Sequence, residues 1–179
     1  MTATAELALS ETVVDDKEYE VVNGIKEAKM AGGIHGRTIM RLGARLQMFV
    51  EQQQLGDFYS PDTTFLIGAE DRLPDLAFIS NARLPENGVP VGKWEIAPDL
   101  AVEVASPNDL HRKVQNKLRD YFAAGVREVW LVEPEFKTVT VYQSPTRNTI
   151  LTEDEELTSV VLPGFRCDLR EIFASPTKP

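Results

Sequence analysis

The sequence predicts an α/β fold arranged around a mixed β-sheet. Two long segments carry apolar residues at helical spacing, and short apolar runs of strand length lie before, between and after them. The resulting order of hairpin, helix, strands, helix and strands is typical of a sheet that packs against helices. A length of 179 residues with 42% hydrophobic and 26% charged residues fits one globular domain. We expect that domain over residues 17–174, between a flexible N-terminal arm (1–16) and a C-terminal tail (175–179).

The first half of the chain supplies a hairpin, a long helix and three short strands. The dipeptide Asn23-Gly24 favours a tight turn, so the segments on either side of it, 19–22 and 25–28, are expected to form a hairpin. A helix is expected over about 34–54, because one apolar stripe recurs at helical spacing: Ile39, Leu42, Leu46, Phe49 and Val50. The remaining expectations are strands at 58–60, 64–67 and 75–80 and a loop at 83–93, which holds two prolines and two glycines.

The second half of the chain contains the strongest central-strand candidate, residues 100–105, which is apolar on both faces apart from Glu103. Capping residues at 106–109 precede a helix over about 109–124, which Gly125 is expected to end. The later expectations are a buried strand at 129–132, its hairpin partner at 138–142, an acidic loop at 153–156, a final strand at 159–162 and a short helix at 169–173.

Composition and charge exclude several kinds of protein. The net charge of -9 disfavours a protein that coats DNA non-specifically, although bound cations can offset an acidic active site. No apolar run reaches membrane-spanning length, and residues 1–16 lack the pattern of a secretory signal. The single cysteine, Cys167, excludes an intramolecular disulfide and a cysteine zinc cluster. We therefore expect a cytoplasmic protein with no membrane partner.

Two carboxylates in apolar runs are the main candidates for chemistry. Asp75 opens the 75–80 run and Glu103 lies inside the next one, where an unpaired charge would be expensive to bury. If the two strands are antiparallel neighbours, the carboxylates can face each other across about 5 Å. Asp99 is a poor partner for Glu103, because four residues of extended chain span about 13 Å. The pair could bind a divalent cation for phosphodiester chemistry.

Lys117, on the helix that follows Glu103, is the third candidate. It projects only about 60° from the centre of that helix's apolar face, so it can reach back toward Glu103. Tyr121, one turn further on, would cover the lysine stem, and Gln115 lies nearby. A lysine in this position could stabilise charge on a phosphate or position the attacking water.

Structural explanations remain open for each of these residues. Asp75 could simply begin a strand, Glu103 and Lys117 could form a buried ion pair, and Lys117 could be a surface lysine. His35 is expected to be a surface or structural histidine, and with His111 makes too few histidines for a histidine-rich zinc site. A stripe of arginines on the first helix is expected to be a solvated face or to contact phosphates: Arg37, Arg41 and Arg45.

Several motifs together resemble the Uma-two family of endonucleases, within the restriction-endonuclease-like PD-(D/E)XK superfamily. The resemblance runs from about Glu18 to Phe173. Its motifs are Tyr-Glu-Val-Val-Asn-Gly from Tyr19, Pro-Asp from Pro74, the segment 98–107 with Glu-Val-Ala-Ser-Pro, Lys-Leu-Arg-Asp-Tyr from Lys117, Gly-Val-Arg-Glu-Val-Trp from Gly125, and Leu-Pro-Gly-Phe from Leu162.

The resemblance implies a restriction-endonuclease-like mixed sheet flanked by helices, with extra hairpins. It also implies that Asp75 and Glu103 bind magnesium or manganese, which polarises the phosphate and activates water. Ala105 stands where the superfamily has a lysine, and Lys117 matches a lysine that the family has on the following helix. Glu20 matches an N-terminal acidic position and is a further candidate for metal or water binding.

The leading hypothesis is therefore a metal-dependent DNA endonuclease of restriction or mobile-element type. The main alternative is a catalytically inert module that keeps the nuclease fold and binds DNA or a protein, which the acidic charge and Ala105 favour. A hydrolase of RNA or small phosphodiesters would share the same site. A homodimer would suit cleavage of both strands of a duplex.

Overall fold

The structure, a computed structural model, describes residues 19–22, 25–28, 32–105 and 111–175, with side chains for 32–105 and 114–175. The expected arm at 1–16, the Asn23-Gly24 turn and the capping stretch at 106–109 lie outside the described residues.

A six-stranded mixed sheet forms the centre, in the order β10-β9-β8-β7-β6-β3. The strands are β3 (Gly56–Tyr59), β6 (Leu76–Ser80), β7 (Leu100–Val104), β8 (Glu128–Glu133), β9 (Thr138–Ser144) and β10 (Arg147–Thr152). Strands β7 and β8 are parallel, and the other neighbouring pairs in this sheet are antiparallel. A parallel pair needs a crossover, and the helix α2 (His111–Ala123) lies within the connection from β7 to β8. The predicted α/β class is confirmed.

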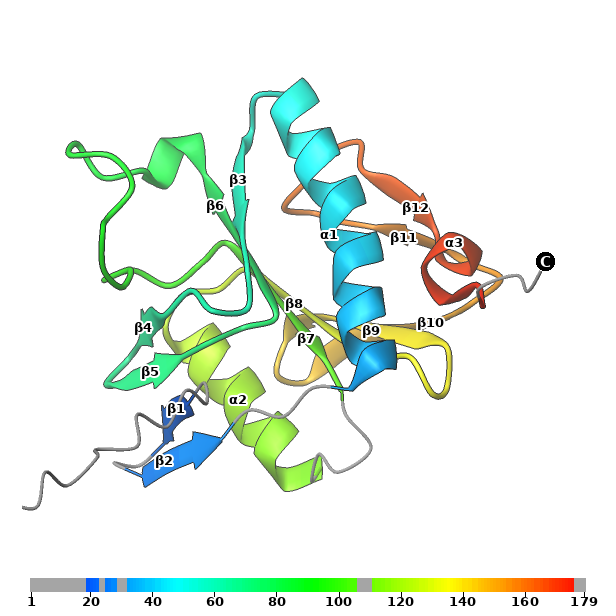
Figure 1. The fold of residues 1–179 in the computed structure, drawn as a ribbon, viewed down its shortest axis with the longest axis horizontal. Coiled ribbons are helices and arrows are strands. Elements are labelled where there is room, and N and C mark those ends of the chain that lie inside the picture. The colour runs from blue at the N-terminus through cyan, green and yellow to red at the C-terminus, as the bar shows by residue number, and fades with distance from the viewer. Residues whose placement is uncertain (1–18, 23–24, 29–31, 106–110, 176–179) are drawn as a thin grey trace, which may run out of the picture.

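The two long helices cover opposite faces of this sheet (Figure 1). Alternate residues of β6 divide between the faces: Leu76 and Phe78 pack with the helix α1 (Gly33–Gln52), whereas Ala77 and Ile79 pack with α2. The apolar stripe predicted for the first helix provides the buried face of α1, with Leu42, Leu46 and Val50 fully buried, Ile39 nearly so and Phe49 partly buried.

Smaller elements surround the central sheet. A second sheet has the order β2 (Ile25–Ala28), β1 (Tyr19–Val22), β5 (Glu70–Arg72) and β4 (Phe65–Ile67). A third pairs β11 (Glu156–Thr158) with β12 (Arg166–Asp168), beside the short helix α3 (Leu169–Phe173). A single 3-10 turn, Asn81–Arg83, opens the predicted loop, and α2 ends before Gly125 as expected.

The sequence-based expectations were partly wrong, mainly in the C-terminal region. Residues 159–162 form no strand, because the Ser159 hydroxyl accepts hydrogen bonds from the amides of Val161 and Leu162 and so favours a turn. Strand β10 was missed because it lies at the sheet edge with mostly exposed side chains and no apolar run. Strand β5 was missed for a similar reason, since Glu-Asp-Arg carries no apolar pattern.

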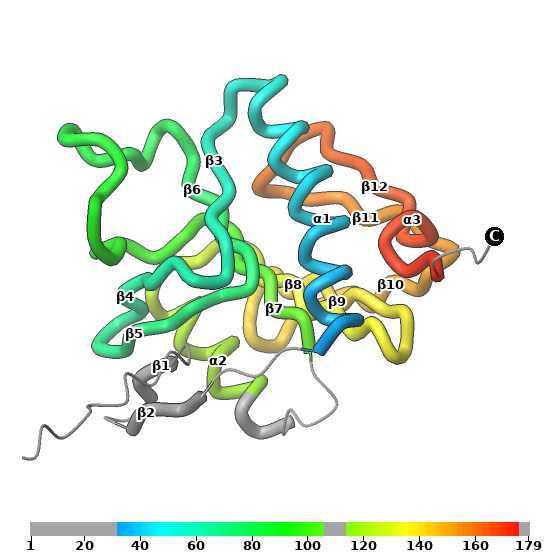
Figure 2. The backbone as a smooth tube through the Cα atoms, in the orientation of Figure 1, coloured from blue at the N-terminus to red at the C-terminus, as the bar shows by residue number. Residues whose placement is uncertain are grey.

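The start of α1 lies beside the end of β7, as the backbone trace in Figure 2 shows. Close packing of α1 on β6 contributes to this placement, since a Cβ on Gly43 would lie 3.2 Å from a methyl group of Leu76. At the far end of β6, Gly56 has a φ of +152°, and a Cβ there would lie 2.1 Å from the Ile79 carbonyl oxygen, so β3 needs glycine to pair this closely. Neither α1 nor any other helix of the described residues has the length and apolarity to cross a membrane.

Candidate active site

Asp75 and Glu103 come from neighbouring antiparallel strands, as the sequence predicts. In the register of β6 and β7, Leu76 pairs with Val102, and one further step would place Asp75 opposite Glu103. Asp75 is almost fully buried, at 1% exposure, and its Oδ2 accepts a hydrogen bond of 2.6 Å from the Val104 amide. The strand pairing therefore brings both carboxylates to the same edge of the sheet.

Glu103 is held by two side chains of α2. Its Oε2 lies 3.1 Å from the Nζ of Lys117, and its Oε1 accepts a hydrogen bond of 2.5 Å from the Tyr121 hydroxyl. Lys117 and Glu103 remain partly exposed, with side-chain exposures of 23% and 15%. Lys117 thus reaches Glu103 from the edge of the helix, and the ion pair considered from sequence is present.

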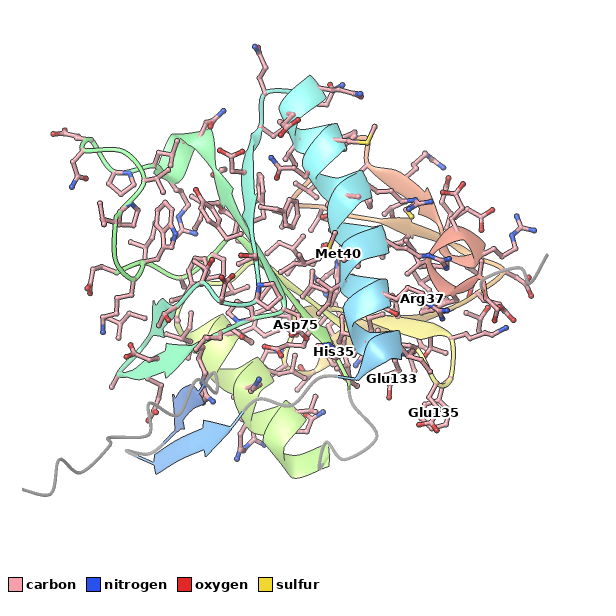
Figure 3. The ribbon with its side chains drawn as sticks, viewed as in Figure 1. His35, Arg37, Met40, Asp75, Glu133 and Glu135 are labelled. Atoms are coloured by element: carbon pink, nitrogen blue, oxygen red, sulfur yellow. The ribbon has the colours of Figure 1, made fainter. Side chains whose placement is uncertain are left out.

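His35, in the first turn of α1, contacts Asp75 and was not singled out as a site residue from sequence. Its Nε2 lies 3.2 Å from Oδ2 of Asp75, and the two side chains are labelled next to each other in Figure 3. The histidine is 8% exposed, so of the surface and structural positions expected for it, the surface one is excluded. A signal was available, because His35 lies four residues before Ile39 on the buried stripe, where a polar side chain requires a partner.

Ala105 and Glu20 bear on the resemblance in different ways. The Ala105 amide donates a hydrogen bond of 2.8 Å to the Val132 carbonyl. The backbone pairing of β7 with β8 therefore continues to Ala105, the position where the superfamily has its lysine. In the described side chains, Lys117 is the lysine that reaches Glu103. Glu20 lies on β1, which joins β5 through the pair Val21 and Asp71, but its side chain is not among those described.

Gln115 lies near a tyrosine of β9, Tyr142. Its side chain is one of the groups that influence the pKa of the Tyr142 hydroxyl. Burial raises the pKa of Tyr142, the side chain of Gln115 lowers it, and the negative charge of Glu133 raises it further, so that the net shift is upward. Gln115 thus lies on the α2 side of the sheet, near Tyr142.

The arginine stripe of α1 packs largely against the C-terminal region. Arg41 donates to the carbonyl oxygens of Ile172, at 3.2 Å, and Ala174. Arg45 forms an ion pair of 2.8 Å with Glu171. Arg37 is half-buried, and its Nε makes no hydrogen bond to the described residues. These contacts connect α1 to α3 and leave the proposed phosphate contacts as a prediction.

The donor chemistry of the two carboxylates fits a hard divalent cation. Magnesium prefers oxygen ligands and is commonly held by one or two carboxylates, with water completing the octahedron. Within the described side chains, no cluster of three or more His, Cys, Asp or Glu residues is arranged to hold a metal ion. Asp75 and Glu103 could thus supply two ligands, with water or substrate supplying the others.

Comparisons with known proteins show the family and the fold of this chain. Residues 6–170 match the model of the Uma2 family, described as "Putative restriction endonuclease". A crystal structure of a "putative nuclease belonging to DUF820" from Anabaena variabilis has a similar fold, with a TM-score of 0.78 and 21% sequence identity. The match covers 87% of this chain and 89% of that protein. No curated protein matches the chain.

Proposed function

Because this chain belongs to the Uma2 family, whose fold and family description indicate a restriction-endonuclease-like nuclease, we propose that it is a metal-dependent DNA endonuclease that hydrolyses phosphodiester bonds. The observation that carries this proposal is the placement of Asp75 and Glu103 on adjacent strands, with Lys117 in contact with Glu103. The three residues are assigned as the catalytic group, and the two carboxylates as ligands of magnesium or manganese.

Each assigned residue has a distinct role. Asp75 and Glu103 would hold the cation, which would supply Lewis acidity toward a phosphate oxygen and lower the pKa of water. The Lys117 ammonium would stabilise negative charge on the phosphate as it is attacked. The Tyr121 hydroxyl restricts the rotation of the Glu103 carboxylate through the 2.5 Å hydrogen bond. Two residues remain second-tier candidates. Gln115 lies near the site on α2, and Glu20 is a candidate for metal or water binding.

DNA is the proposed substrate although the chain carries a net charge of -9. Phosphate contacts must then be local, and bound cations must offset the acidic site. Arg37 is the strongest candidate of the α1 stripe for such a contact, because the guanidinium groups of Arg41 and Arg45 are bonded to the α3 region. A homodimer would present two sites to the two strands of a duplex, and sedimentation of the protein with and without DNA tests that arrangement.

The second candidate is an inert nuclease-fold module that binds DNA or a protein. The ion pair between Lys117 and Glu103 favours it, because a lysine that neutralises Glu103 can serve the fold alone. Ala105 also favours it, since it replaces the usual superfamily lysine directly after β7. Binding that survives chelation and loss of Glu103 would identify this module.

Nicking of supercoiled plasmid distinguishes the two candidates. Wild type, Glu103→Gln and Asp99→Asn should be compared with magnesium, with manganese and with excess chelator. Asp99→Asn is the control carboxylate-to-amide change, because Asp99 directly precedes the strand that carries Glu103 but is held by Ser80, Arg83 and Arg127. We expect metal-dependent nicking by wild type and by Asp99→Asn. Nicking by Glu103→Gln should be slower by about 100-fold or more. Equal nicking by Glu103→Gln would contradict the site assignment.

A further inference from the structure

We propose that His35 is a positioning residue that orients the Asp75 carboxylate for a divalent cation, an inference that rests on the proposed function. Two groups contact one oxygen of Asp75, Oδ2. The Val104 amide donates a hydrogen bond to it at 2.6 Å, and the His35 Nε2 lies 3.2 Å from it. The two groups belong to different elements, β7 and α1, so together they restrict both the place and the rotation of the carboxylate.

The burial of His35 argues that the imidazole is present for this contact. Its Nδ1 is buried and makes no hydrogen bond to any residue that the structure describes. A buried polar atom without a hydrogen bond costs about 1–3 kcal/mol, whereas an apolar side chain of similar size would fill the space without that loss. Packing alone therefore does not account for a histidine on the buried stripe of α1, and the contact from Nε2 to Asp75 does.

A second copy of the same tetrapeptide provides an internal comparison. Pro-Asp-Leu-Ala occurs at 74–77 and at 98–101, and both aspartates are 1% exposed. The Oδ1 of Asp99 lies 3.4 Å from the guanidinium of Arg83 and 3.8 Å from that of Arg127. Its Oδ2 accepts a hydrogen bond of 2.9 Å from the Ser80 amide. Arginine is always charged, so Asp99 is compensated by fixed positive charge.

Asp75 instead has an imidazole among its contacts. The Nε2 of an imidazole can donate to a carboxylate, so the His35 ring can orient Asp75. Oriented ligands bind metal more tightly, and loss of the orienting group typically weakens affinity by 10–100-fold. The same tetrapeptide thus serves a structural role at one end of the sheet and, in this proposal, a ligand role at the other.

Manganese affinity measured by calorimetry tests the role of His35 without relying on cleavage. The informative pair is His35→Gln and His35→Asn. The amide nitrogen of glutamine can reach the place of Nε2, whereas that of asparagine lies nearer Nδ1 and falls short of Asp75. Thr38→Val is the control, since it changes another buried polar side chain of α1 and removes the hydrogen bond from Thr38 to the Ile34 carbonyl. Thermal unfolding establishes that each variant is folded.

We expect His35→Gln and Thr38→Val to bind manganese within about threefold of wild type, and His35→Asn to bind at least about tenfold more weakly. Wild-type affinity in His35→Asn would overturn the role of His35 and leave the proposed function standing. An equal loss in His35→Gln and His35→Asn would also overturn it, because the donor at Nε2 would then be irrelevant. Absence of manganese binding in wild type would overturn the proposed function and this inference together.

Discussion

The Nζ of Lys117 lies 3.1 Å from Oε2 of Glu103, so the helix α2 brings a positive charge directly to the carboxylate assigned to the metal. A cation that binds Glu103 must share that carboxylate with the lysine or displace it. The lysine therefore opposes metal binding electrostatically, even if it assists the reaction at phosphate.

This opposition gives Lys117→Met an uncommon combination of effects. Plasmid nicking should fall by about 100-fold or more, because transition-state charge loses its partner. Manganese affinity should stay equal or increase, because the competing ammonium is gone. Nicking rates and calorimetry on the same samples measure both effects. Arg119→Met, which removes an exposed cation from α2, should change neither, and continued nicking by Lys117→Met would refute its catalytic role.

Tyr121→Phe should destabilise the protein, because the fully buried hydroxyl donates to a carboxylate. Hydrogen bonds to charged groups contribute about 1.5–3 kcal/mol, and urea unfolding should reveal a loss in this range. The control is Tyr142→Phe, which removes the hydroxyl of another buried tyrosine, near the neutral side chain of Gln115, and should cost about 1 kcal/mol or less. Equal stability of Tyr121→Phe and wild type would show that the bond to Glu103 contributes nothing.

Glu128 should be the most sensitive carboxylate for stability. It is fully buried and accepts hydrogen bonds from Trp130 Nε1 at 2.7 Å, the Ser159 hydroxyl at 2.8 Å and the Val160 amide at 3.1 Å. Glu128→Ala leaves these donors without an acceptor and should lower the free energy of unfolding by about 3 kcal/mol or more. Urea titration measures the change, and a loss below about 1 kcal/mol would contradict this account.

Cys167 should react slowly with thiol reagents in the folded protein. Burial raises its pKa to about 11 from an ordinary 9.0, so the reactive thiolate is scarce at neutral pH. Because the folded pKa is the higher one, the unfolded chain loses its proton first as the pH rises from about 9 to 11, and stability falls across that window. Labelling rates in native buffer and in urea check the prediction, and similar rates in both would contradict it.

The sequence predicted those parts of the fold and site that depend on local pattern. The stripe of α1 and the apolar run of β7 were identified because burial leaves a pattern of apolar residues in the sequence. The end of α2 was identified because Gly125 follows it. Asp75, Glu103 and Lys117 could be grouped because two strands and a helix face limit where side chains point. The contact between His35 and Asp75 was not predicted, because it joins residues 40 positions apart through the packing of α1 on β6.

A crystal of the protein soaked in manganese, with anomalous diffraction, tests the central claim most directly. We predict one anomalous peak with carboxylate oxygens of both Asp75 and Glu103 about 2.0–2.6 Å from it. A peak that touches neither carboxylate, or a fully soaked crystal with no peak between them, would contradict the assignment of this pair as the metal site.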